Sequence, residues 1–109
     1  MKSNVYFAED KLKQAYTQLE HSKTEDQQLH NWISKAINAL ANNAFSGTQI
    51  PKGLIPKVYL KKYRIDNLWK YDLPKGWRLV YSVAKKEVCV ITIILEWFSH
   101  KEYEKRFKY

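Results

Sequence analysis

A basic and aromatic set of residues in the second half of the chain has the side chains needed for chemistry on a phosphodiester. Arg78 lies in a segment of alternating apolar residues, and His100, Lys101 and Tyr103 follow near the C-terminus. An imidazole titrates near neutral pH and can accept or donate a proton, while guanidinium and ammonium groups stabilise charge developing on phosphate. A tyrosine can donate a proton or stack on a splayed base. These residue types suit metal-independent RNA cleavage, in which a ribose 2′-hydroxyl attacks the adjacent phosphorus and expels the 5′-oxygen.

Each of these residues also has a structural interpretation, which the residue types alone leave open. His100 could be a capping or surface residue at a helix start, and Arg78 could form a cross-strand ion pair with Asp72 or Glu96. Four further basic residues could contact phosphates, or could form a solvated strand edge that discourages pairing between molecules. They are Lys57, Lys61, Lys62 and Arg64.

Several other chemistries lack their sequence motifs. The chain has no Gly-rich phosphate loop, no Gly-x-Ser-x-Gly elbow and no His-Glu-x-x-His. Its three histidines are dispersed, and its single cysteine, Cys89, lies in the most apolar segment, where a small core residue is the simplest interpretation. We therefore expect neither a metal nor a cofactor. A lone cysteine and the absence of an apolar run of about 20 residues predict a cytoplasmic protein.

The charge is distributed unevenly along the chain. Residues 1–50 carry five lysines and five acids, whereas residues 51–109 carry fourteen Lys and Arg against six acids, which accounts for the whole net charge of +8. This asymmetry indicates that one face meets a polyanion such as nucleic acid or an acidic protein. The length of 109 residues and the hydrophobic content of 45% predict a single folded domain over residues 1–109.

The first half of the chain has helical periodicity. Thr24 followed by Gln27 resembles a capping box, and apolar residues then recur at helical spacing from Leu29 to Ala44. A shorter stripe over residues 12–19 predicts a second helix, preceded by a possible short strand at residues 5–7. Because only residues 21–23 separate the two helices, we expect an antiparallel helical hairpin.

The second half has the composition of strands. Residues 57–65, 68–73 and 77–83 are rich in aromatic and branched side chains with partial or full alternation. After a turn at residues 85–87, residues 88–95 are apolar on both faces, as in a central strand. Ser99 begins a short closing helix over residues 99–107. The order predicts an α+β fold, a helical hairpin followed by an antiparallel meander.

Two segments resemble the RelE/ParE toxin superfamily. The first is residues 67–81, whose most specific part is the run Gly76-Trp77-Arg78-Leu79-Val80-Tyr81. The second is Ser99-His100-Lys101-Glu102-Tyr103, which follows the apolar strand. Together with the preceding helical hairpin, the resemblance covers most of the chain. It implies two N-terminal helices packed on a twisted, mainly antiparallel sheet of four to five strands, with a short C-terminal helix.

The resemblance also implies a function. Many members of the superfamily are toxins of type II toxin-antitoxin pairs that cut mRNA in the ribosomal A site, so mRNA, the ribosome and a small acidic antitoxin are the expected partners. By motif, Arg78 supports phosphate charge, His100 or Lys101 occupies the end of the last strand, and Tyr103 matches the C-terminal tyrosine. RNA-binding residues are expected at Lys57, Lys61, Lys62, Arg64 and Lys101.

A second function remains open, because one branch of the superfamily inhibits DNA gyrase without being a nuclease. A non-catalytic protein of this kind, or a degenerate relative that only binds an antitoxin, needs the basic face but no His-Tyr pair. A general RNA-binding domain is a third possibility.

Overall fold

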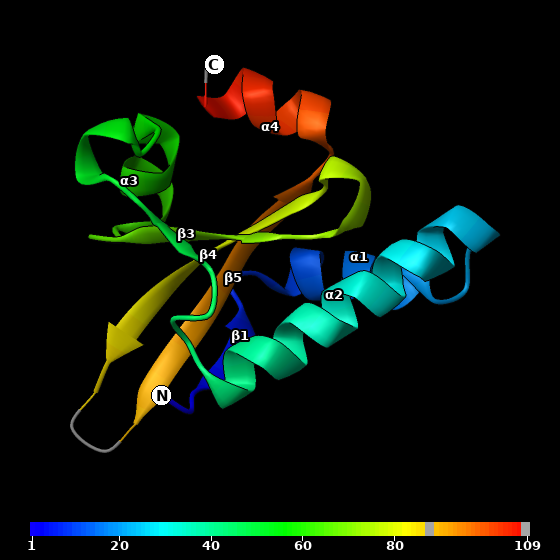
Figure 1. Cartoon of the computed structure of the whole chain (residues 1–109), viewed down its shortest axis with the longest axis horizontal. Coiled ribbons are helices and arrows are strands. Elements are labelled where there is room, and N and C mark those ends of the chain that lie inside the picture. The colour runs from blue at the N-terminus through cyan, green and yellow to red at the C-terminus, as the bar shows by residue number, and fades with distance from the viewer. Residues whose placement is uncertain (87–88, 108–109) are drawn as a thin grey trace.

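Helices cover both faces of one five-stranded mixed sheet in an α+β structure (Figure 1). The computed structural model describes residues 1–86 and 89–107. In spatial order the strands are β1 (Asn4–Phe7), β5 (Val90–Phe98), β4 (Arg78–Lys85), β3 (Leu68–Asp72) and β2 (Thr48–Ile50). The helices are α1 (Asp10–Leu19), α2 (Thr24–Asn42), α3 (Lys57–Tyr63) and α4 (His100–Phe107), with 3₁₀ turns η1 (Lys52–Leu54) and η2 (Pro74–Gly76).

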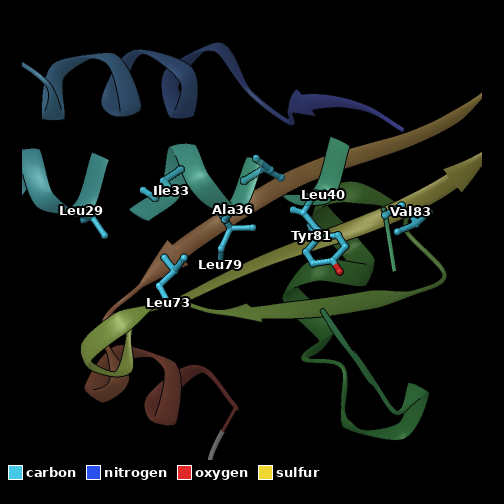
Figure 2. Packing of buried hydrophobic residues seen from close by; sticks show 10 residues of the cluster. Leu29, Ile33, Ala36, Leu40, Leu73, Leu79, Tyr81 and Val83 are labelled. Atoms are coloured by element: carbon cyan, nitrogen blue, oxygen red, sulfur yellow. The ribbon is translucent and has the colours of Figure 1, made fainter. Parts of the chain in front are cut away.

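The predicted helical hairpin is confirmed as α1 and α2. The buried residues of α2 follow the expected stripe, and Figure 2 shows this stripe lying against Leu79 and Tyr81 of β4. The predicted capping box is wrong: Lys23 is the N-cap, and Thr24 is already helical. Gln27 Nε2 instead donates to the Ser22 carbonyl at 2.9 Å, so the residue before the N-cap receives the bond.

The strands over residues 68–72 and 78–85 follow the predicted alternation. Leu79, Tyr81 and Val83 of β4 pack against α2, on what we call the hairpin face of the sheet. Arg78 and Val80 point to the opposite side, the α3–α4 face, where Val80 joins a second core with residues of α3 and α4. The two cores therefore lie on opposite faces of one sheet, and only the second has Arg78 beside it.

The sheet is mixed because its first strand runs parallel to its neighbour. β1 pairs with β5 in parallel, while the β2–β3, β3–β4 and β4–β5 pairs are antiparallel. The apolar segment predicted as a central strand is paired on both sides as β5, although β4 is the middle strand of the five. Glu87 of the predicted turn and Val88 of the predicted strand lie outside the described residues.

The expected strand at residues 57–65 is wrong, because this segment forms helix α3. Its aromatic residues suggested a strand, but the residues that point inward are Ile55, Tyr59 and Tyr63, spaced four apart as on one face of a helix. Val58 and Leu60, which alternation would have placed with a core, are exposed. The helix ends at Arg64, whose φ of 53° is left-handed.

A β-bulge shapes the α3–α4 face. The register shifts between Val80 and Tyr81: Val80 lies opposite Glu96, whereas Tyr81 lies opposite Ile94, so Leu95 is the extra residue of β5. A bulge of this kind leaves two residues opposite one and turns both toward the same face. Leu95 packs in the second core, and Glu96 accepts a hydrogen bond from the Tyr59 hydroxyl of α3. Both side chains therefore lie on the α3–α4 face.

Candidate functional site

The strand register brings Arg78, His100 and Tyr103 to one end of the sheet. Arg78 opens β4 opposite Phe98, the last residue of β5, and α4 begins two residues later at His100. The Arg78 guanidinium carbon lies 5.4 Å from the centre of the Tyr103 ring. Gly76, in the η2 turn that precedes Arg78, is so close to His100 that a Cβ there would lie 2.8 Å from the His100 Cβ. Tyr103 therefore contacts Arg78, and His100 lies against the turn that leads into Arg78.

Arg78 is held on the α3–α4 face by an acidic partner on the next strand. Its side chain is 18% exposed, and its Nε lies 3.0 Å from Asp72 Oδ1. The buried Nε–H has no hydrogen-bond alignment with that oxygen, so the contact is an ion pair, while Nη1 donates to the Trp77 carbonyl at 3.2 Å. The predicted cross-strand pair with Asp72 is thus confirmed. The guanidinium is fixed in place by its neighbours before any ligand arrives.

Lys70 joins this group from β3. Its Nζ donates to both oxygens of Asp72, at 2.9 and 3.2 Å. One carboxylate therefore lies between two cations, and the cluster keeps a formal excess of one positive charge. A cluster with that excess attracts an anion such as a phosphodiester.

His100 lies in the first turn of α4, after the predicted serine cap. The Glu102 amide donates to Ser99 Oγ at 3.3 Å, and the Ser99 amide donates to Glu102 Oε1 at 3.5 Å, which completes a capping box. The His100 side chain is 58% exposed, with Nε2 at 2.8 Å from Glu104 Oε1. The cap fixes the helix start and so places an accessible imidazole beside η2.

Tyr103 is buried, with 2% of the residue exposed. Its ring stacks on Phe107 at 4.4 Å between ring centres and packs against Phe98 at 5.9 Å. The contacts described here make the ring a support for the Arg78 guanidinium through a cation–π contact.

A second polar group connects α3, β5 and α4 on the same face. Arg106 Nη1 donates to both oxygens of Glu96 at 2.9 and 3.0 Å, and the Tyr59 hydroxyl donates to Glu96 Oε2 at 3.0 Å. Burial raises the pKa of the Tyr59 hydroxyl, and the negative charge of Glu96 raises it further. Tyr59 therefore stays protonated as a donor, and the group fastens α4, with His100 and Tyr103, to the sheet.

The residues predicted to bind RNA have different surroundings. Lys57 lines a cavity of about 840 Å³ between α3 and α4, together with Lys105 and Arg106. Lys62 instead forms an ion pair with Glu9 of the α1 N-cap at 3.0 Å, which lowers the pKa of Glu9. Lys61 and Lys101 are exposed. Arg64 lines a separate cavity of about 730 Å³.

From the sequence, Lys70 and Glu104 were not assigned to the site, and Asp72 was considered only as an ion-pair partner of Arg78. Alternation along β3 could have placed Lys70 and Asp72 on one face, but their proximity to Arg78 depends on the β3–β4 register. Glu104 follows His100 by four residues, the helical spacing at which side chains meet. That signal was present in the sequence.

Comparisons of the chain with protein-family models, curated proteins and solved structures give no match. Within residues 1–86 and 89–107, no helix combines the length and apolarity needed to cross a membrane. In the same part of the chain, no three His, Cys, Asp or Glu residues form a group that could hold a metal ion.

Proposed function

We propose that the chain is a RelE/ParE-like toxin of a type II toxin-antitoxin system, and that it cleaves ribosome-bound mRNA without a metal. The observation that carries the proposal is that one end of the sheet holds both a restrained guanidinium, Arg78 at the start of β4, and an accessible imidazole, His100 two residues after the strand partner of Arg78. Cleavage through a 2′-hydroxyl needs charge stabilisation and proton transfer. These two side chains supply both.

In the proposed reaction, the phosphodiester lies over the cluster of Lys70, Asp72 and Arg78. The 2′-oxygen loses its proton and bonds to phosphorus, the bond to the 5′-oxygen breaks, and the 5′-oxygen takes a proton. The products are a 2′,3′-cyclic phosphate and a 5′-hydroxyl. Arg78 and Lys70 stabilise the charge that grows on the phosphate oxygens, and His100 exchanges a proton with a reacting oxygen.

The remaining parts of the proposal follow from the resemblance and from charge. The chain has an α+β structure with four helices and a five-stranded mixed sheet, which is compatible with the α+β fold that the resemblance implies. Lys57, Lys61 and Lys101 would contact RNA phosphates outside the scissile position, while Lys62 and Arg64 would contact more distant ones. The net charge of +8 suits a small acidic antitoxin as the cognate partner, and mRNA cleavage places the protein in the cytoplasm.

One observation favours a second candidate function, a non-catalytic binder such as a gyrase inhibitor or an antitoxin-binding relative. Tyr103 is buried and packs as a core residue, and both Arg78 and His100 already have acidic partners. A binder would need only the basic surface and would tolerate loss of the imidazole.

Induction of the chain in growing cells, followed by mapping of mRNA 5′ ends, tests the proposal. We expect codon-phased cleavage with the wild type and its loss in a His100→Ala, Tyr103→Phe double variant. Phenylalanine keeps the buried ring and removes only the hydroxyl. Arg78→Ala should lower cleavage at least about 100-fold, because charge stabilisation at the phosphate is lost. Lys35→Ala on the exposed side of α2 is the matched control and should cleave normally.

Growth arrest without new mRNA ends would contradict the nuclease and support the non-catalytic binder. Gyrase activity would then be assayed. Unchanged cleavage by Arg78→Ala would remove Arg78 from the site.

A further inference from the structure

The two nitrogens of the His100 imidazole have different surroundings. Nε2 lies 2.8 Å from Glu104 Oε1, one helical turn further along α4. Nδ1 lies on the side of Gly76, where a Cβ added to the glycine would be 3.8 Å from Nδ1 and 3.4 Å from Cγ. One nitrogen therefore points to a carboxylate, and the other lies beside η2, the turn that leads into Arg78.

A neutral imidazole carries one hydrogen, and the nitrogen that holds it is set by its hydrogen-bond partner. An ionised carboxylate only accepts hydrogen bonds. At 2.8 Å from Nε2, a Glu104 oxygen would face a second lone pair if that nitrogen carried no hydrogen, so Glu104 favours the hydrogen on Nε2 and leaves the lone pair on Nδ1. Gly76 lies against the other side of His100, because a Cβ added there would be only 2.8 Å from the His100 Cβ.

We propose that Glu104 is a positioning residue that fixes the His100 tautomer, so that Nδ1 is the nitrogen that exchanges a proton with the substrate. This inference rests on the proposed nuclease function. In the cleavage step, the Nδ1 lone pair accepts the proton of the attacking 2′-hydroxyl, and Glu104 remains ionised beside the resulting imidazolium. The positive charge on the ring is then offset by Glu104 while the phosphate charge is offset by Arg78.

The tautomer is measured directly by nitrogen-15 NMR of the purified wild-type chain at a pH where the imidazole is neutral. We expect His100 to carry its hydrogen on Nε2 almost exclusively. In Glu104→Ala the ratio should move to that of His21, an exposed histidine in the α1–α2 connection that serves as the internal reference. Glu104→Gln keeps an amide oxygen as acceptor and should stay close to the wild type. A ratio that is unchanged in Glu104→Ala would overturn the inference.

The kinetic arm uses cleavage of mRNA on programmed ribosomes. Glu104→Ala should lower kcat about tenfold with KM unchanged, less than the ~10⁴-fold loss known for a buried orienting aspartate, because this pair is exposed. Glu104→Gln should stay within about threefold of the wild type, since its amide oxygen keeps a lone pair facing Nε2 without the charge. Glu25→Ala, which removes an exposed acid at the start of α2, controls for net charge and should have no effect.

The outcomes separate this inference from the function on which it rests. A wild type that cleaves, with Glu104→Ala equal to it, overturns the role of Glu104 and leaves the nuclease standing. A wild type that cleaves no RNA overturns the nuclease and any catalytic role for Glu104, whatever the NMR shows of the pair.

Discussion

The two faces of the sheet are built from the same strands but have different chemistry. On the hairpin face, the core joins α2 to β4 and β5 through apolar and aromatic side chains such as Ile33, Leu79 and Ile94. On the α3–α4 face, Val80 and Leu95 are flanked by Arg78 and by the Glu96–Arg106 pair. Burying charged groups costs free energy that pairing only partly returns. The comparison indicates that the hairpin face is stabilised mainly by apolar packing, while the α3–α4 face combines an apolar core with charged groups held by their partners.

The largest effect should come from opening a cavity in the hairpin-face core. Ile33 is fully buried in α2, and alanine is a good helix former, so Ile33→Ala removes packing without removing the helix. We expect a loss of about 2–5 kcal/mol in the free energy of unfolding, measured with urea. Asn38→Ala, at an exposed position of the same helix, is the control and should be nearly neutral. Cleavage per folded molecule should not change, and a selective loss of cleavage would contradict the division between the faces.

A smaller loss is expected from the charged group of the α3–α4 face. Glu96→Ala leaves Arg106 and Tyr59 without their shared acceptor, which should cost about 1–3 kcal/mol. Glu104→Ala breaks the exposed pair of Glu104 with His100 in α4 and should cost about 0–1 kcal/mol. Urea unfolding of both variants compares their free energies of unfolding. Equal stabilities would show that the Glu96 group does not fasten α4.

Gly76 tests how η2 limits the position of His100. Its φ of +80° is left-handed, and a Cβ would lie 2.8 Å from the His100 Cβ, so Gly76→Ala is strained in both respects. We expect a loss of about 1–2 kcal/mol from the backbone conformation, together with a changed chemical shift of the His100 ring. Gly53→Ala meets nothing within 4 Å of its added Cβ and is the matched control. An unmoved His100 resonance in Gly76→Ala would mean that the contact does not hold the ring.

The sequence predicted the elements whose signal is local. The stripe of α2, the alternation of β4 and the serine cap of α4 each depend on neighbours a few residues apart, and all three were confirmed. The segment of α3 was misread because exposed Val58 and Leu60 imitate strand alternation. Strand pairing could not be predicted from local patterns, because the parallel β1–β5 pair and the Leu95 bulge depend on contacts between segments far apart in the sequence.

The candidate site also has features that the sequence predicts and features that it does not. Arg78, His100 and Tyr103 could be selected by residue type and motif, and the β4–β5 register brings Arg78 and the start of α4 to the same end of the sheet. The burial of Tyr103 and the placement of Lys57 and Arg64 in two separate cavities could not be predicted, because both depend on how the helices pack on the sheet.

The smallest effect should come from an exposed ion pair that links the two sides of the molecule. Lys62 of α3 hydrogen-bonds Glu9 at the start of α1 and lowers the pKa of that carboxyl from 4.5. A carboxyl whose pKa is lower in the folded state stabilises the fold above pH 4.5, and this contribution is lost as the pH falls through the lower folded value. Lys62→Gln should therefore lower stability slightly at pH 6 and have no such effect at strongly acidic pH. Lys61→Gln is the control, because it removes the same charge from the neighbouring exposed position and so changes the repulsion among the basic residues equally.

Urea unfolding at both pH values gives the difference in the free energy of unfolding between Lys62→Gln and Lys61→Gln. Identical curves for the two variants would mean that the Glu9–Lys62 contact adds nothing to the stability of the fold.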